Sequence, residues 1–388
     1  MKLYPVDTNN HAAIKAGTAA IAPGTFNVTI SSSSSGLSVN YSSSSVSLQS
    51  YAVTGCPTNS LVTCCSIQKV FNGLISSTPA QQPGIWQWQQ SSTNVYNYVT
   101  VTGDVFCDQP LFVPSNTYLV LNGKLTASPS INMGFATALI SMTGSVATSG
   151  SYSGVIAGSP GATIDCNYLP YSGVKIFNAT NALLEGITVQ HCGTPSIVPP
   201  ILPAVLVMGF TGKNTSEIAH CNIINNPGIG VLIQKGKRVV VYKNTIQNSS
   251  IGVALIVGSQ RTIVTGNTIT LNRGNGISSD SSSTLSVFEG NTISMNTGNG
   301  VAIFNAVSSA QGTAVYVNGT TAYTPGTSQD NIIMRNTIFQ NGKASILLSA
   351  NGLFPIAATK IIGNTISGNG FGVQVGILQT FIKYYKLL

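Results

Sequence analysis

The acidic residues are the first group to consider, because hydrolysis of a glycosidic bond usually needs two carboxyl groups that face it. The chain has nine of them: Asp7, Asp104, Asp108, Asp165, Glu185, Glu217, Asp280, Glu289 and Asp330. Asp104 and Asp108 are the closest pair, and their spacing could place both on one face of a strand. Asp104 and Asp108 are therefore the candidates for a pair of catalytic acids. The competing interpretation is that they are two surface acids that flank Cys107. Asp165 is expected to be structural.

Two histidine–cysteine pairs offer a second kind of chemistry. His191-Cys192 and His220-Cys221 could each supply a nucleophile with its base, or two metal ligands. The cysteines of the chain, however, contain no C-x-x-C pair with metal-site spacing. We therefore expect a disulfide or core role for these pairs, and neither a metal site nor a cofactor.

Two tryptophans could contact sugar. Trp86 and Trp88 alternate in Ile85-Trp-Gln-Trp-Gln89, so they share one face of an extended segment. On the surface they could stack on sugar rings, and the competing interpretation is a packing or interface role.

Charge is scarce. Only 7% of the 388 residues are charged, and 17 Lys+Arg against 9 Asp+Glu give a net charge of +8. The one basic cluster is Lys235, Lys237, Arg238 and Lys243, which is neither the dense stripe nor the module typical of nucleic-acid binding. We expect no nucleic-acid partner, while contact with an acidic polysaccharide stays compatible with this charge. The most apolar stretch, residues 197–210, is too short to span a bilayer.

Two features favour a secreted protein. Six N-x-[ST] triplets could accept N-linked glycans, at Asn27, Asn40, Asn178, Asn214, Asn248 and Asn318. Seven cysteines are disulfide candidates: Cys56, Cys64, Cys65, Cys107, Cys166, Cys192 and Cys221. Disulfides indicate an oxidising compartment, and an odd number leaves one thiol over. No signal-peptide hydrophobic region follows Met1, so we expect that the leader is not present in this sequence.

An internal repeat organises the second half of the chain. Asn-Thr-Ile recurs at Asn244, Asn267, Asn291, Asn336 and Asn364, and Asn222-Ile-Ile precedes them. The spacings are 22, 23, 24, 45 and 28 residues. A period of 22–24 is too short for helix-pair repeats and suits one coil of three short strands and three turns. Asn and Gly in segments such as Asn272-Arg-Gly-Asn-Gly276 suit the sharp corners.

Stacked coils would bring like residues together about 4.8 Å apart. We expect an inward ladder of isoleucines, namely Ile246, Ile269, Ile293, Ile338 and Ile366. The repeated Asn residues should form a second ladder at a corner, amide to amide. One coil cannot bury its apolar face alone, so the coils must stabilise each other.

From about residue 221 to 375 this pattern resembles the pectin-lyase-like right-handed parallel β-helix superfamily, with PbH1-type repeats. Residues 110–125, 161–166 and 184–189 resemble earlier coils. The resemblance implies an all-β solenoid. Hydrolases of the superfamily carry Asn-Thr-Asp, Asp-Asp and Gly-His-Gly signatures, and its C5-epimerases carry Asp-Pro-His; this chain has none of them. Lyases of the superfamily use Ca²⁺ held by several carboxylates, and no such cluster is visible here.

Alignment on the repeated Asn places Arg238 and Arg261 at equivalent positions of adjacent coils, about 5 Å apart at Cα. Two like charges so close suggest a polyanion contact or, by resemblance to the lyases, a catalytic base. The competing interpretation is two long side chains that splay into solvent at a corner.

We expect three parts: a Ser/Thr-rich β N-terminal part over 1–99 with Cys56, Cys64 and Cys65, a β-helix over 100–376, and a C-terminal cap or assembly tail over 377–388. The 45-residue spacing leaves two alternatives open, a degenerate coil or a loop over about 306–329.

Three functions compete. The first is an extracellular, glycosylated structural or assembly subunit of a fibre, filament or wall, which self-associates end to end. The second is a polysaccharide lyase or hydrolase-like enzyme, which the missing carboxylate signatures disfavour. The third is a carbohydrate-binding protein without turnover.

Overall fold

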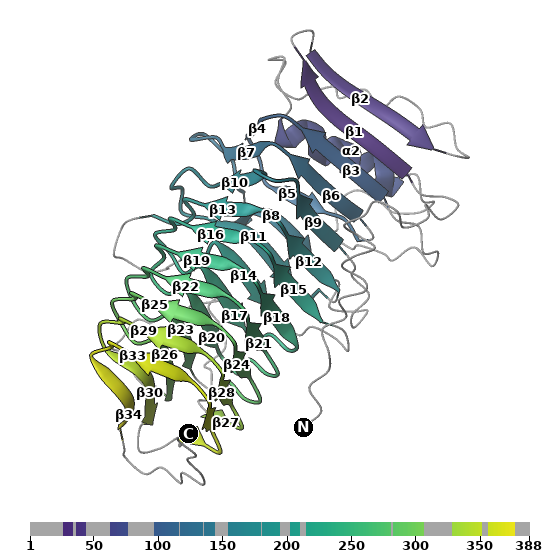
Figure 1. Ribbon diagram of the computed structural model, residues 1–388. Helices are drawn as coiled ribbons and strands as arrows, with labels where there is room; N and C mark the ends of the chain where they lie inside the picture. The colour runs from purple at the N-terminus through teal and green to yellow at the C-terminus, as the bar shows by residue number, and fades with distance from the viewer. Residues whose placement is uncertain are drawn as a thin grey trace.

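The computed structural model describes residues 26–33, 36–43, 63–76, 97–115, 117–134, 136–143, 154–179, 181–194, 202–209, 215–280, 282–305, 328–350 and 356–376. These residues form a solenoid of stacked coils with three long sheets on its sides (Figure 1). Every strand pair is parallel except β1–β2, which is antiparallel.

Each coil contributes one short strand to each sheet. The 12-stranded sheet, sheet A, contains in spatial order β2 (Gly36–Ser43), β1 (Phe26–Ser33), β3 (Asn97–Thr102), β6 (Thr117–Asn122), β9 (Gly154–Gly158), β12 (Ala182–Glu185), β15 (Ser216–Ala219), β18 (Val239–Tyr242), β21 (Ile263–Thr265), β24 (Val287–Glu289), β28 (Ile332–Met334) and β32 (Lys360–Ile362).

Sheet B, with ten strands, contains β4 (Val105–Cys107), β7 (Lys124–Ala127), β10 (Thr163–Asp165), β13 (Thr188–Gln190), β16 (Asn222–Ile224), β19 (Thr245–Gln247), β22 (Thr268–Thr270), β25 (Thr292–Ser294), β29 (Thr337–Phe339) and β33 (Thr365–Ser367). Sheet C, also with ten, contains β5 (Leu111–Val113), β8 (Ala138–Thr143), β11 (Ser172–Phe177), β14 (Val205–Met208), β17 (Val231–Gln234), β20 (Val253–Ile256), β23 (Ile277–Asp280), β26 (Val301–Asn305), β30 (Ala344–Ala350) and β34 (Phe371–Gly376). A small fourth sheet pairs β27 (Ser328–Gln329) with β31 (Ile356–Ala357).

The expected isoleucine ladder runs through the middle of sheet B. Ile246, Ile269, Ile293, Ile338 and Ile366 pair in register from coil to coil. The first four are fully buried, and they belong to one continuous core inside the solenoid. The period-2 alternation of each strand turns its middle residue inward, so the core is a stack of branched aliphatic side chains.

The expected asparagine ladder lies at the corner before sheet B. Within the ladder, the Oδ1 of each Asn accepts two hydrogen bonds from the equivalent Asn of the preceding coil, one from its backbone N–H and one from its Nδ2. The Nδ2 of each Asn also donates to a backbone carbonyl of that preceding coil. The side-chain pairs are Asn244–Asn267, Asn267–Asn291, Asn291–Asn336 and Asn336–Asn364, at 2.9–3.0 Å. Buried amides are stable here because every polar atom has a partner.

A second ladder, which the sequence analysis does not predict, lies at the corner after sheet B. It joins Asn272, Asn296, Asn341 and Asn369 in the same way. Each of these residues follows the repeated Asn by five positions, so the signal was present in the sequence. Sheet B is therefore held between two lines of hydrogen-bonded amides.

The alignment of Asn222 with the repeated Asn is wrong by one residue. Asn222 pairs in register with Thr245, and its side chain is exposed. Cys221 occupies the corner position instead: its backbone N–H donates to Asn244 Oδ1, and its Sγ contacts the carbonyl of Ala219 at 3.2 Å. The thiol thus begins the ladder in place of an amide.

The long spacing is an insertion and not a degenerate coil. Strand β25 pairs directly with β29, and β26 pairs directly with β30, so no coil lies between them. The additional residues fall between β26 and β27, and residues 306–327 lie outside the described residues.

An α-helix, α2 (Cys64–Ser76), closes the N-terminal end of the solenoid where the sequence analysis expected only strands. Ile67 and Phe71 on this helix are fully buried and join the core. Strands β1 and β2 extend sheet A beyond β3 at the same end (Figure 1).

Candidate functional site

Asp104 and Asp108 lie at opposite ends of β4, and the structure engages both in backbone hydrogen bonds. Asp104 Oδ1 accepts from the Lys124 backbone N–H at 3.1 Å. Asp108 Oδ1 accepts from the Cys65 backbone N–H at 3.2 Å, at the beginning of α2. Four residues of strand separate their Cα atoms by about 13 Å. Asp104 thus stabilises the backbone at the beginning of β7, and Asp108 stabilises the first turn of α2, where a carboxylate is a favoured partner for a free N–H.

Arg238 and Arg261 lie at the corner between sheets C and A, both with positive φ. The neighbouring residues Lys237 and Gln260 form a parallel bridge, so the two arginines are at equivalent positions of adjacent coils, as expected. Arg238 is half-buried and Arg261 is exposed. The nearest described acid in the same column is Asp330, two coils beyond Arg261.

The cysteines form disulfides at the N-terminal half of the solenoid. Cys64–Cys107 joins α2 to β4, and Cys166–Cys192 joins two adjacent coils. Cys65 is disulfide-bonded as well. Cys221 is instead a free, fully buried thiol, and burial raises its pKa to about 12. A thiol with so high a pKa is a poor nucleophile.

The glycan acceptors differ in exposure. Asn248 is exposed, and Asn178 is half-buried. Asn27 lies in β1 and Asn40 in β2, whose side chains the structure does not describe. Asn214, Asn318, Trp86, Trp88 and Cys56 lie outside the described residues.

The structure assembles a cluster that the sequence analysis did not predict, from three successive coils. Lys124 begins β7, Asp165 ends β10, Tyr168 lies in the following turn, and Gln190 ends β13 with His191 directly after it. Asp165 pairs in register with Gln190, which brings the coils' polar ends together on the outer face of sheet B. We call these five residues the Asp165 cluster.

The Asp165 carboxylate is the centre of the cluster, and it is only 4% exposed. Its Oδ2 is 2.9 Å from Lys124 Nζ and accepts from Gln190 Nε2 at 2.9 Å. Its Oδ1 is 3.1 Å from His191 Nδ1 and accepts from the Asn167 backbone N–H at 2.9 Å. A buried carboxylate with this many donors is strongly stabilised in its charged form.

The electrostatics of Asp165 follow from these contacts. Burial opposes its ionisation, but the hydrogen bonds from Gln190, Lys124, Asn167 and His191 outweigh burial, so the pKa is lowered from 3.8. Both carboxylate oxygens are occupied, and the group is therefore an anchor and not a proton acceptor at neutral pH.

His191 and Lys124 are the members of the Asp165 cluster that could take part in a reaction. His191 stacks on Tyr168 with ring centroids 4.4 Å apart, and its Nδ1 is engaged by Asp165, so Nε2 is the atom that could exchange a proton. The side chain of Lys124 is 43% exposed and carries a positive charge beside it. A histidine oriented by a carboxylate next to a cation can move a proton near a bound anion. The single carboxylate does not provide the two acids of glycoside hydrolysis.

Sequence reasoning missed this cluster because its other members are 41 to 67 positions from Lys124 in the sequence and come together only when the coils stack. The early coils also lack the Asn-Thr-Ile marker that would have aligned them. His191 was assigned a disulfide or core role, and its neighbour Cys192 is indeed disulfide-bonded. His220 is exposed and contacts Tyr242 edge to face at 5.5 Å.

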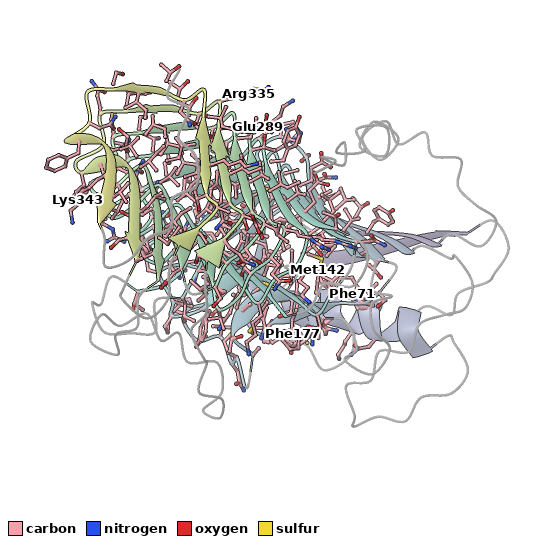
Figure 2. All side chains as sticks on the ribbon, turned by 90° about the horizontal axis from the view of Figure 1, so that it is seen from below. Phe71, Met142, Phe177, Glu289, Arg335 and Lys343 are labelled. Carbon is pink, nitrogen blue, oxygen red and sulfur yellow. A yellow bond between two sulfur atoms is a disulfide. The ribbon has the colours of Figure 1, made fainter. Side chains whose placement is uncertain are left out.

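Outside the Asp165 cluster, we considered ion pairs, metal sites and membrane-spanning helices among the described residues. Glu289 and Arg335 form an ion pair at 3.0 Å on the surface, where Figure 2 labels them side by side. No three His, Cys, Asp or Glu side chains gather as a metal site in the described coils. Within the same residues, none of the helices has both the length and the apolarity needed to cross a membrane.

Comparison with known proteins agrees with this architecture. Residues 204–315 match the family described as "Right handed beta helix region". No curated protein matches the chain. Among solved structures, the chain is similar to the Dettilon tailspike protein gp208 with a TM-score of 0.53 and 13% identity, over 82% of this chain and 59% of that one.

Two further structures are similar. The periplasmic alginate epimerase AlgG has a TM-score of 0.50 and 12% identity over 84% of this chain and 83% of that one. ORF18 of Geobacillus virus E2 has a TM-score of 0.50 and 10% identity over 82% of this chain and 58% of that one. The chain thus spans less than two thirds of the tailspike and of ORF18. Such low identities show a shared fold alone.

The repeats, the three long parallel sheets and the match of residues 204–315 together show that the chain folds as a right-handed parallel β-helix.

Proposed function

We propose that the chain is an extracellular, glycosylated β-helix scaffold, a structural or assembly subunit of a cell-surface fibre, filament or wall. The observation that carries this proposal is the state of its acids. Asp104 and Asp108 cap backbone groups, Asp165 is saturated by donors, and Glu289 pairs with Arg335. Asp104 and Asp108, the closest acidic pair in the sequence, are thus tied to backbone groups on either side of β4 instead of facing one bond together, as polysaccharide hydrolysis requires.

Three further observations support an extracellular location and a structural role. The disulfides Cys64–Cys107 and Cys166–Cys192 suit an oxidising compartment. The exposed Asn248 is suited to carry an N-linked glycan. The amide ladders and the continuous core join each coil to the next along the solenoid, which suits a structural role.

The proposal is tested on the protein expressed in a glycosylating eukaryotic host. We expect glycan mass on Asn248 by peptide mass spectrometry, oligomers by electron microscopy, and no new reducing ends or unsaturated products from a panel of polysaccharides. Turnover of any polysaccharide by the purified chain would overturn the scaffold function.

A second candidate, an enzyme that acts on an acidic polysaccharide, is favoured by one observation, the Asp165 cluster. Lys124 would neutralise the carboxylate of a uronic acid residue, and His191 Nε2 would exchange the proton on the adjacent carbon. AlgG, which shares the fold, is an alginate epimerase. The chemistry proposed for this chain is proton abstraction next to a carboxylate.

The two candidates separate in one assay. Alginate and pectate are incubated with the protein, and proton NMR follows inversion at C5 and elimination products. Activity that is lost in His191→Gln but kept in His220→Gln, whose histidine lies outside the Asp165 cluster, would establish the enzyme. Inactivity of the unmodified protein on both polymers favours the scaffold.

A further inference from the structure

Positive charge is concentrated in one continuous part of the solenoid. Residues 218–279 contain six Lys and Arg residues and no Asp or Glu, so this stretch supplies six of the net charge of +8. It runs from the end of β15 into β23, and the structure describes all of it. The charge of these successive coils is therefore purely basic, in a chain that is otherwise close to neutral.

Four of the six cations lie at one corner, between sheets C and A. Lys235, Lys237 and Arg238 lie between β17 and β18, and Arg261 lies at the same corner of the next coil, between β20 and β21. Lys235 and Arg261 are exposed, and Lys237 and Arg238 are half-buried. We call these four residues the Arg238 ridge.

The other two cations lie at the other two corners. Lys243 Nζ is 4.9 Å from the centre of the Tyr242 ring, at the corner between sheets A and B. The Arg273 guanidinium donates to the Pro227 carbonyl at 2.5 Å, near the corner between sheets B and C. The Arg238 ridge is thus the place where the basic side chains of this stretch gather.

Hydrogen bonds between the two coils fix the backbone of the ridge. The Arg238 backbone N–H donates to the Gln260 carbonyl at 2.9 Å, and the Gln260 backbone N–H donates to the Gly236 carbonyl at 2.8 Å. Lys237 and Gln260 also form a parallel bridge. Arg238 and Arg261 are therefore held at equivalent positions about 5 Å apart at Cα. Because the backbone is already ordered, a ligand has to order only side chains.

Acids are few around the ridge. Among the described residues, Glu217 lies on β15 in the coil before, in register with Val240, and is half-buried. Asp280 ends β23, one coil after β20, and is 5% exposed. Asp330 lies two coils beyond Arg261. One half-buried carboxylate in the adjoining coil leaves four clustered cations with a net positive charge, which attracts a polyanion.

We propose that the Arg238 ridge binds an acidic polysaccharide, namely a polyuronate laid along the solenoid axis. The inference rests on the proposed scaffold function for the choice of polymer, and it adds the partner that attaches the scaffold to a wall or matrix. A guanidinium group pairs with a carboxylate through two parallel hydrogen bonds. A polyuronate carries a carboxylate on each sugar, so successive carboxylates meet Arg238 and Arg261 on adjacent coils.

Charge density and composition favour a polyuronate over a nucleic acid. Four cations on two coils are not the dense basic stripe typical of nucleic-acid binding. The corner segments, residues 235–238 and 257–261, contain no aromatic side chain on which a base could stack. The ridge is also a different place from the Asp165 cluster, which lies on the outer face of sheet B in earlier coils.

The test is the binding of a fluorescently labelled oligogalacturonate to the full chain, measured by thermophoresis at low and at physiological salt. We expect binding that weakens as salt rises, because the contact is between exposed charges. The triple variant Lys235→Gln/Arg238→Gln/Arg261→Gln should bind at least tenfold more weakly and depend less on salt. Lys235→Gln/Arg261→Gln, which changes only exposed side chains and should keep the fold, should bind at least threefold more weakly.

A matched control removes the same charge from later coils. The triple variant Arg335→Gln/Lys343→Gln/Lys360→Gln also lowers the net charge by three, and all three side chains are exposed. Its affinity for the oligogalacturonate should change less than twofold. Equal weakening by the ridge variant and this control would show attraction to net charge alone and would overturn the inference.

Other results would also overturn the ridge as a polyuronate site. Tighter binding of a thymidine oligonucleotide than of the oligogalacturonate at the same salt would assign the ridge to nucleic acid. Binding that is lost in Lys124→Gln but kept in the ridge variants would move the site to the Asp165 cluster. A chain that forms oligomers but does not bind the oligogalacturonate would overturn the ridge alone. A chain that binds through the ridge and also cleaves the polymer would overturn the scaffold function alone.

Discussion

The buried amide ladders should dominate the stability of the later coils, and Asn296→Ala is the clearest test. Asn296 Nδ2 donates to the Ile269 carbonyl at 3.2 Å and to Asn341 Oδ1 at 2.9 Å. Its Oδ1 accepts from the Asn272 backbone N–H at 3.0 Å and from Asn272 Nδ2 at 2.8 Å. Each hydrogen bond contributes about 1 kcal/mol net. Losing all of them should lower the free energy of unfolding by about 4 kcal/mol, because their partners stay buried.

The assay is urea unfolding at neutral pH, followed by far-UV circular dichroism. Asn222→Ala is the matched control, since its side chain is exposed on the outer face of sheet B, and its effect should stay within about 0.5 kcal/mol. A loss of less than about 1 kcal/mol for Asn296→Ala, or equal losses for both variants, would refute the view that the ladders stabilise the coils.

Three further variants follow from buried polar groups, each measured by the same unfolding assay. The second ladder extends back to Asn226, which accepts from the Cys192 backbone N–H and donates to the Val189 carbonyl. Ser249 interrupts it between Asn226 and Asn272 with a buried hydroxyl that has no hydrogen-bond partner, and Ser249 lies beside Gly230 as Asn272 lies beside Gly252. Ser249→Asn should therefore add about 1–2 kcal/mol; a loss would contradict the ladder argument. Ser279→Val should add about 1 kcal/mol, because this buried, unpaired hydroxyl sits in an apolar column, and destabilisation would count against that assignment. The pKa of Asp165 is lowered from 3.8 in the folded protein, so the stabilisation from its carboxylate is present above pH 3.8 and is lost as the pH falls through the folded value. Asp165→Asn should therefore be less stable than the unmodified chain at neutral pH, and the difference should shrink below about pH 4; a difference that does not change with pH would be inconsistent with this.

The sequence predicted the interior of the later coils well because their length is nearly constant. A constant period places Ile269 against Ile293 and Asn267 against Asn291 without any knowledge of the rest of the chain. The same reasoning failed at Asn222, since an Asn on the outer face and an Asn at the corner look alike in sequence. It also overlooked the second ladder, whose members recur at the same period.

What the sequence determined by itself is the repeating unit: its period, its inward isoleucines and its corner amides, and with them the fold class. Tertiary structure alone decided how Lys124, Asp165 and His191 meet, and that α2 packs on the N-terminal end of the solenoid. The reason is physical. Repeat contacts follow from local periodicity, whereas the Asp165 cluster and the helix at the N-terminal end join segments separated by irregular lengths, which pair only once the coils have stacked.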